Sequence, residues 1–135
     1  MKFYPLDKTT NVPYPAFAGV VVANTFTYSL PADVATGDII EIGVLPHGCH
    51  LVDAKVITDA VGITADIGFI TDDAEKTCGA ELFPGVNLAE AAVTPLSNTT
   101  AYRSPTDDEE RSIGLVVKGG TPTGGLVTLQ VEYTA

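Results

Sequence analysis

Three residues close together in the sequence have side chains that commonly bind metal ions. His47, Cys49 and His50 combine imidazole and thiol groups, which are typical zinc ligands, and Cys78 could supply a fourth. In a hairpin, however, Cys49 and His50 would point to opposite faces of the sheet, so at most two of the three local residues can converge. The sequence therefore predicts no metal and no other cofactor. A small metal-dependent enzyme that uses His47, His50 and an acidic residue is the catalytic alternative.

Nucleophilic and acid–base catalysis also lack the residues that they need. No G-x-S-x-G nucleophile elbow occurs, and Cys78 is interpreted as a small core residue, since one lysine alone is near enough in sequence to lower its pKa. The carboxylates at 72–73 and 107–110 lie in segments with the composition of exposed loops. Glycoside hydrolysis would also need sugar-stacking aromatic residues, and the chain has no tryptophan. We predict no catalytic residue and no enzymatic activity, while calcium binding at 107–110 stays open.

The composition limits the partners that the chain can bind. Seventeen acidic and seven basic residues give a net charge of −10, which disfavours nucleic acids and anionic membranes. Charged residues make up only 18% of the chain, which indicates either burial against other subunits or a surface of small polar residues. No apolar run is long enough to span a bilayer and no signal peptide is recognisable, so we expect synthesis in the cytoplasm.

Residues 1–15 are predicted to form an extended N-terminal arm. Pro5, Pro13 and Pro15 exclude a continuous helix or a central strand. The arm carries too many apolar side chains for a free tail, so we expect it to lie on its own domain or on a neighbouring molecule, without adding a regular strand. The candidates for interface contacts are Phe3, Tyr4, Leu6, Tyr14 and Phe17.

Alternating apolar and polar residues predict strands along most of residues 16–135, which we expect to form a single domain. The regular runs are 25–30, 40–44, 52–56, 63–69, 113–117 and 127–133. Less regular segments suggest strands at 16–23, at 80–83 and near Tyr102, and one helical turn at 88–92. About seven to nine strands without a long helix predict an all-β fold, an antiparallel, jelly-roll-like β-sandwich.

Two of these runs are expected to form a hairpin. The turn residues 46–48 separate the run at 40–44 from the run at 52–56. On the first strand Ile40, Ile42 and Val44 are expected on one face, with Glu41 and Gly43 on the other. On the second strand the apolar face is expected to hold Val52, Ala54 and Val56.

Several segments after the arm have a familiar pattern: Leu30–Pro46, Leu51–Ala54, Thr64–Gly68, Thr77–Phe83, Pro105–Asp108 and Arg111–Gly114. These segments resemble a family of small virion proteins that tailed bacteriophages encode near the major capsid protein. Such proteins are similar to head decoration, or cement, proteins, which are β-sandwich subunits that assemble as trimers on the capsid and clamp neighbouring capsid subunits. The arm matches no pattern of that family, so the resemblance leaves the mode of docking open.

The resemblance implies a structural role in the virion. It implies a non-catalytic decoration protein on the capsid surface that binds and stabilises the lattice of the major capsid protein, acts as a homotrimer and binds neither nucleic acid nor membrane. The alternative is a carbohydrate-binding domain associated with a phage tail or fibre, because sandwiches often carry sugar sites in their loops. The absence of tryptophan argues against that alternative.

Overall fold

The computed structural model describes residues 3–4, 21–46, 48–70, 77–96 and 111–134. These residues form strands and no helix, so none of them belongs to a helix long and apolar enough to cross a membrane. The strands are β1 (Phe3–Tyr4), β2 (Val22–Leu30), β3 (Ile39–Leu45), β4 (His50–Thr58), β5 (Ile63–Phe69), β6 (Phe83–Asn87), β7 (Ala92–Pro95), β8 (Arg111–Gly120) and β9 (Gly125–Thr134).

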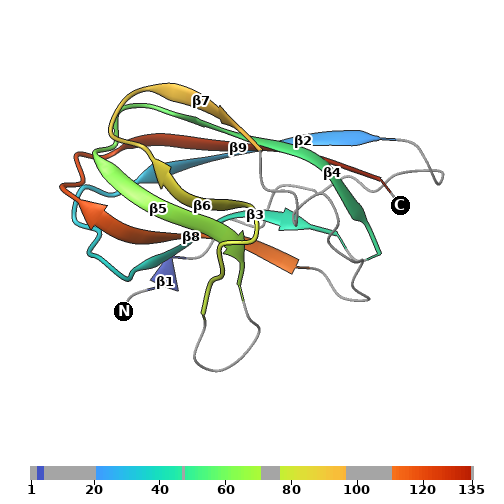
Figure 1. The fold of residues 1–135 in the computed structure, drawn as a ribbon, viewed down its shortest axis with the longest axis horizontal. Helices are drawn as coiled ribbons and strands as arrows, with labels where there is room; N and C mark the ends of the chain where they lie inside the picture. The colour runs from blue at the N-terminus through green and yellow to red at the C-terminus, as the bar shows by residue number, and fades with distance from the viewer. Residues whose placement is uncertain (1–2, 5–20, 47, 71–76, 97–110, 135) are drawn as a thin grey trace.

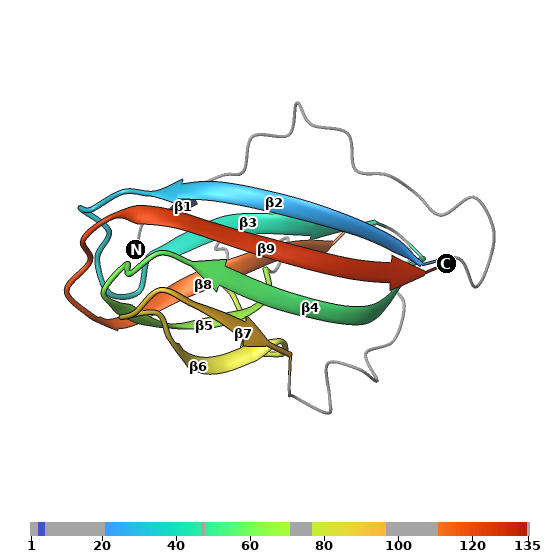
Figure 2. The same ribbon diagram turned by 90° about the horizontal axis from the view of Figure 1, so that it is seen from above.

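The strands form two sheets that stack face to face (Figures 1 and 2). One sheet has five strands in the order β1-β3-β8-β5-β6, and the other has four in the order β2-β9-β4-β7. Every pairing is antiparallel except that of β1 with β3, which is parallel. The predicted fold class, an all-β antiparallel β-sandwich, is confirmed.

The core lies between the sheets and is built from alternate residues of each strand. In β9, Val127, Leu129, Val131 and Tyr133 are at most 1% exposed, while the residues between them face outward, as the alternation predicts. β5 follows the same rule with Ile63, Ala65 and Ile67. Continuous apolar burial of this kind is the main favourable contribution to folding.

The predicted hairpin between β3 and β4 is wrong. β3 pairs with β8 in the five-stranded sheet, whereas β4 pairs with β9 and β7 in the other sheet. The chain therefore crosses from one sheet to the other between Leu45 and His50. A period of two residues identifies a strand but does not choose its partner, because each side of a strand can pair with any strand of matching length.

Two β-bulges change the faces on which the side chains of β3 and β4 lie. In β3 the register shifts between Glu41 and Gly43, and a Cβ on Gly43 would lie 2.7 Å from Cδ2 of Leu129, on the core side. Gly43 therefore faces the core, although it was expected on the polar face. Val44 is 1% exposed and belongs, with Ile40 and Ile42, to the buried core cluster. Glu41, expected to be on the polar face, is only 3% exposed.

The bulge in β4 falls between Leu51 and Asp53. It makes Leu51, not Val52, the buried residue that precedes Ala54 and Val56 in the core. A bulge inserts one residue. The side chains on its two sides still alternate, but each set lies on the face opposite to the one that continuous alternation across the bulge would give. The expected apolar face of this strand is therefore correct from Ala54 onward and wrong at Val52.

The segment between β5 and β8 also differs from the expectation. No helical turn forms at Leu88, where the chain passes from β6 to β7. The Leu88 amide donates to the carbonyl of Ile63 at 2.8 Å, and its own carbonyl accepts from the amides of Val61 and Gly62. The strand expected at 80–83 starts only at Phe83, and β7 was missed. The strand expected near Tyr102, and the part of the 16–23 strand up to residue 20, lie outside the described residues.

Candidate interaction surface

The groups that could bind a metal do not converge in the part of the chain that the structure describes. Cys49 is buried, whereas His50 is exposed at the start of β4, so the two neighbours do point in different directions. His47 lies outside the described residues, as do the acidic residues at 72–73 and 107–110. Among the described residues, no group of three or more His, Cys, Asp or Glu side chains is arranged to hold a metal ion.

Cys78 lies on the outer face of the five-stranded sheet and not in the core as expected. Its sulfur occupies the space above two glycines of adjacent strands: a Cβ on Gly114 would lie 3.1 Å from it, and its thiol donates weakly to the carbonyls of Gly68 and Gly79. The pKa of the Cys78 thiol is raised to about 12, mainly by burial and in smaller part by the neighbouring carboxylates of Glu81 and Asp66. The thiol is therefore a packing group and a poor nucleophile at neutral pH.

The raised pKa of Cys78 predicts a loss of stability in alkali. Its ordinary value is 9.0, so between pH 9 and pH 12 the unfolded chain releases a proton that the folded chain retains, and the free energy of unfolding falls as the pH rises. Burial raises the pKa of Tyr133 from 10.0 to about 12 and acts in the same direction. Urea unfolding at pH 8, 10 and 11 measures the effect. The stability difference between the wild type and Cys78→Ser should shrink over this range; a constant or growing difference would contradict the burial of the thiol.

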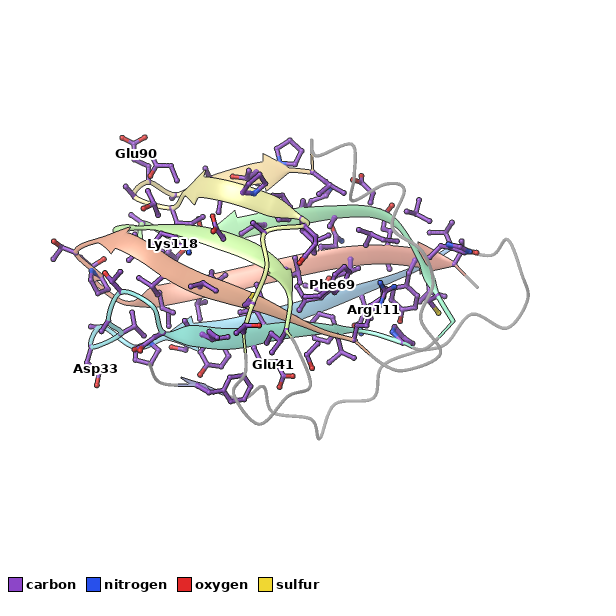
Figure 3. All side chains as sticks on the ribbon, turned by 60° about the horizontal axis from the view of Figure 1, so that its bottom comes forward. Asp33, Glu41, Phe69, Glu90, Arg111 and Lys118 are labelled. Carbon is purple, nitrogen blue, oxygen red and sulfur yellow. The ribbon has the colours of Figure 1, made fainter. Side chains whose placement is uncertain are left out.

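Arg111 connects the two sheets at one end of the sandwich. Its guanidinium carbon lies 4.5 Å from the centre of the Phe69 ring at the end of β5, and Nη2 donates to the carbonyl of Cys49 at 3.4 Å (Figure 3). Cys49 belongs to the crossing from β3 to β4, so this one side chain fixes the start of β8 to both neighbouring segments. A stacked cation of this kind contributes about 0.5–1 kcal/mol where it is partly exposed, which is a structural role.

The opposite end of the sandwich is a closed, acidic surface. Four loops meet there, at 31–38, 59–62, 88–91 and 121–124, and backbone hydrogen bonds such as Thr121 N to Gly62 O connect them. Their charged residues are all acidic: Asp33, Asp38, Asp59 and Glu90. Asp33 and Glu90 both lie at this end (Figure 3). Asp38 accepts a hydrogen bond from the Ala35 amide of its own loop, and Asp59 accepts one from the Leu126 amide of β9, so both are structural in part.

The outer face of the four-stranded sheet carries few charges. The register places Val93, Ile57, Thr128 and Thr27 in one row across it, and the two threonine hydroxyl oxygens lie 3.2 Å apart. Val93 is 60% exposed, and Leu126 is 48% exposed near one end of the same face. Single exposed apolar residues of this kind are ordinary on a protein surface and do not by themselves mark a contact.

Three of the four sheet edges carry features that prevent a further strand from adding. β1 has only two residues, β6 contains Pro84 and a Gly85 with φ of +60°, and β7 has four residues and ends at Pro95. These are the usual protections of an edge strand. β2 has nine residues, no proline and no charged side chain. It forms the outer edge of the four-stranded sheet, on the same side of the sandwich as β1 (Figure 2).

The interface candidates are only partly placed by the structure. Phe3 and Tyr4 form β1, which extends the five-stranded sheet through Ile39 and Ile40 of β3. The expectation that the arm adds no regular strand is therefore wrong at these two residues. The side chain of Phe3 is half-buried. Leu6, Tyr14 and Phe17 lie outside the described residues, and so does most of the arm, so their contact role stays a prediction.

Comparison with solved structures places this sandwich among phage capsid proteins. The chain is similar to a chain in the capsid of Ralstonia phage GP4, with 30% sequence identity and a TM-score of 0.89, covering 98% of this chain and 97% of that one. It is also similar to chains in the cyanophage Pam1 capsid asymmetric unit (17% identity, 95% and 99% covered, TM-score 0.70) and in the acidic stable capsid structure of Helicobacter pylori bacteriophage KHP30 (14%, 88% and 90%, 0.54). No protein-family model and no curated protein sequence matches the chain.

Two packed, largely antiparallel sheets define the described residues as an all-β sandwich. The identity to the Ralstonia phage GP4 capsid chain, over almost the whole length of both chains, then decides the family. The chain belongs to the same family of phage capsid proteins as that chain. The similarities to the Pam1 and KHP30 capsid chains show the fold alone.

One feature of this surface was present in the sequence but was not recognised. The run 22–30 contains no proline, unlike the edge strands β6 and β7, and it is much longer than β1. The alternation identified the strand without showing that it lies at an edge. Edge position depends on strand order, which the sequence pattern does not determine.

Proposed function

We propose that the protein is a capsid decoration, or cement, protein that binds the lattice of the major capsid protein and stabilises it without catalysing a reaction. The observation that carries the proposal is the end-to-end similarity to a chain of the Ralstonia phage GP4 capsid. The match covers 98% of this chain and 97% of that chain. A rigid sandwich with an arm and a long edge strand is suited to bridging larger subunits.

The charge of the protein supports a position on the outside of the capsid. The net charge of −10 repels the phosphates of packaged DNA, which makes the inner surface of the shell unfavourable. We therefore place the protein on the capsid surface, made in the host cytoplasm and assembled as a homotrimer. Light scattering of the purified protein tests the trimer directly.

The experiment that tests the proposal is a titration of undecorated capsids with the purified protein. We expect saturable, stoichiometric binding measured by co-sedimentation, and a rise in the temperature at which the capsids disrupt. Because the protein is acidic, binding should weaken as salt is added. Binding that never saturates, or capsids with unchanged thermal stability, would overturn the proposal.

The arm gives a second prediction within the same assay. A variant in which Leu6, Tyr14 and Phe17 are replaced by serine keeps β1 but removes the remaining apolar candidates, and we expect its affinity for capsids to fall at least about tenfold, because buried aromatic side chains dominate protein interfaces. Val93→Ser is the matched control, since it removes an exposed apolar residue on the opposite side of the sandwich. Equal binding by the triple variant would exclude these residues from the interface.

A further inference from the structure

The hydrogen bonds of the four-stranded sheet identify which backbone groups of β2 point away from the molecule. The Ala54 carbonyl in β4 accepts from the Leu96 amide at 3.0 Å, so the peptide groups of Ala54 point away from β9. Val131 pairs with Ala54 and therefore points toward β2. Its partner in β2, Asn24, points back to β9. The peptide groups of Thr25, the next residue, point out of the sheet.

A side-chain hydrogen bond gives the same orientation independently. The Thr25 N–H donates to Oδ1 of Asn24 at 2.9 Å, which a ladder amide bound to β9 would not do. By alternation, Ala23, Thr27 and Ser29 present their peptide groups in the same outward direction. Among the described residues no strand pairs with these outward peptide groups, and apart from the Thr25 N–H, which Asn24 holds, they form a row of backbone donors and acceptors along β2.

The Asn24 side chain adds a specific signal at this edge. Its Oδ1 holds the outward amide of Thr25, so the side-chain amide lies at the outer border of β2. Its Nδ2 is buried and has no acceptor among the described residues. Buried polar groups in folded proteins are nearly always hydrogen-bonded, so this donor marks a place beside β2 where the described residues leave a hydrogen bond unmade.

The charges around β2 describe the partner. The strand itself is uncharged, but Glu132 lies beside its first residues, across from Ala23, and Asp33 follows its last residue by three positions. Lys55, the nearest described cation on the outer face, is half-buried two strands away from the edge. An added strand is therefore favoured if it is uncharged where it pairs and basic at its ends.

We infer that β2 is a strand-acceptor edge, to which an extended, basic-flanked segment of the major capsid protein adds as a further strand of the four-stranded sheet. The inference rests on the proposed function and names the surface that meets the lattice. Backbone hydrogen bonds along the strand supply affinity, as in other cases of strand addition, while the acidic ends of β2 select the basic flanks. The edge lies on the same side of the sandwich as β1, so arm and edge contact the same neighbour.

A second copy of this chain suits the edge less well. Each copy carries a net charge of −10. In an antiparallel pair of two β2 strands, the end beside Glu132 of one copy would meet the end beside Asp33 of the other, so acidic groups would oppose each other at both ends. The capsid partner avoids this repulsion.

The test uses two proline variants that block different edges. Thr27→Pro removes an outward amide from β2 without removing a backbone hydrogen bond to β9, which is the position where an edge strand tolerates proline. It also removes the hydroxyl contact with Thr128, so Thr27→Val, which loses that contact but keeps the amide, is compared with it. Val93→Pro removes an outward amide from β7, because the Leu96 amide points toward β4 and Val93 therefore points outward. We expect Thr27→Pro to bind undecorated capsids at least about tenfold more weakly than the wild type and Val93→Pro to bind like it. If Thr27→Pro does not fold, the double variant Thr25→Lys, Thr27→Lys replaces it. This variant keeps every backbone amide but places lysines on the edge, which blocks the addition of a strand.

Hydrogen exchange of the wild-type protein gives a readout that needs no variant. In the free protein the outward amides of β2 should exchange quickly, and on capsids they should become slow, while the β7 amides should not change. Capsid binding with unchanged β2 exchange and full binding by Thr27→Pro would overturn the inference and leave the proposed function standing. If the β2 amides of the free protein exchange slowly, and more slowly at higher protein concentration, the edge pairs with a second copy. That result would also overturn the inference. Failure of the wild type to bind capsids would remove both.

Discussion

Replacing Leu129 by alanine is expected to lower the free energy of unfolding by about 2–5 kcal/mol, toward the upper part of that range. Leu129 is fully buried at the centre of β9, and its Cδ2 rests on the bare backbone of Gly43 in the opposite sheet, beside the ring of Phe26. Backbone cannot move into the space that the leucine leaves, so the cavity stays open. Urea unfolding followed by circular dichroism measures the change as a lower midpoint at a similar slope.

Two further variants isolate the cause of this loss. Leu126→Ala removes the same atoms from the same strand, but this side chain is 48% exposed, so we expect a loss below about 1 kcal/mol. Gly43→Ala alone should destabilise the protein, because its Cβ would lie 2.7 Å from the leucine. Combined with Leu129→Ala, the same methyl group should recover part of the lost stability, since it fills the vacated space. Additive losses in the double variant would show that the two sheets do not contact each other at this point.

The sandwich itself could be predicted because its strands follow a simple rule. In β5, β8 and β9, apolar residues such as Leu115 and Val131 alternate with residues that face outward, and one buried face is enough to require that pattern. The glycine-rich segment after β8 could only form a turn. The fold class, the positions of these strands and the absence of a long helix from the described residues all follow from side chains that are local in the sequence.

The partners of each strand, and the faces on which its side chains lie, could not be predicted because they depend on residues distant in the sequence. Nothing in the run at 40–44 shows that a bulge will turn Gly43 toward Leu129, which lies in the other sheet. The alternation of Ile40, Ile42 and Val44 would suit an unbulged strand equally well. The supposed hairpin failed for the same reason, since β3 and β4 each pair more extensively with strands near the C-terminus.

The sequence offered candidates for an interaction surface but not their place in the fold. Low charge left open either burial against other subunits or a surface of small polar residues, and the described residues add which strands lie at the sheet edges. Edge position and outward peptide groups follow from the hydrogen bonds of Ala54 and Leu96, far from β2 in the sequence. The apolar residues of the arm, by contrast, were evident from composition, although only Phe3 and Tyr4 are placed.

Gly68→Ala is expected to destabilise the protein by about 1–3 kcal/mol, and also to expose the Cys78 thiol. A Cβ at position 68 would collide with the backbone of Gly79, lying 2.5 Å from its carbonyl carbon and 2.7 Å from Oε2 of Glu81. Since backbone cannot rotate away as a side-chain end can, the segment from Thr77 to Leu82 must lift off the five-stranded sheet.

The matched control for this substitution lies on the neighbouring strand. Gly119→Ala in β8 places its Cβ 3.5 Å from Oγ1 of Thr64, an ordinary contact, and should change the stability by less than about 0.5 kcal/mol. Thiol labelling at neutral pH supplies the second measurement, because the lifted segment no longer covers Cys78 and its pKa returns toward the ordinary value. If Gly68→Ala is as stable as Gly119→Ala and its thiol stays unreactive, the segment is not packed on Gly68, and the covered thiol of the outer face needs another explanation.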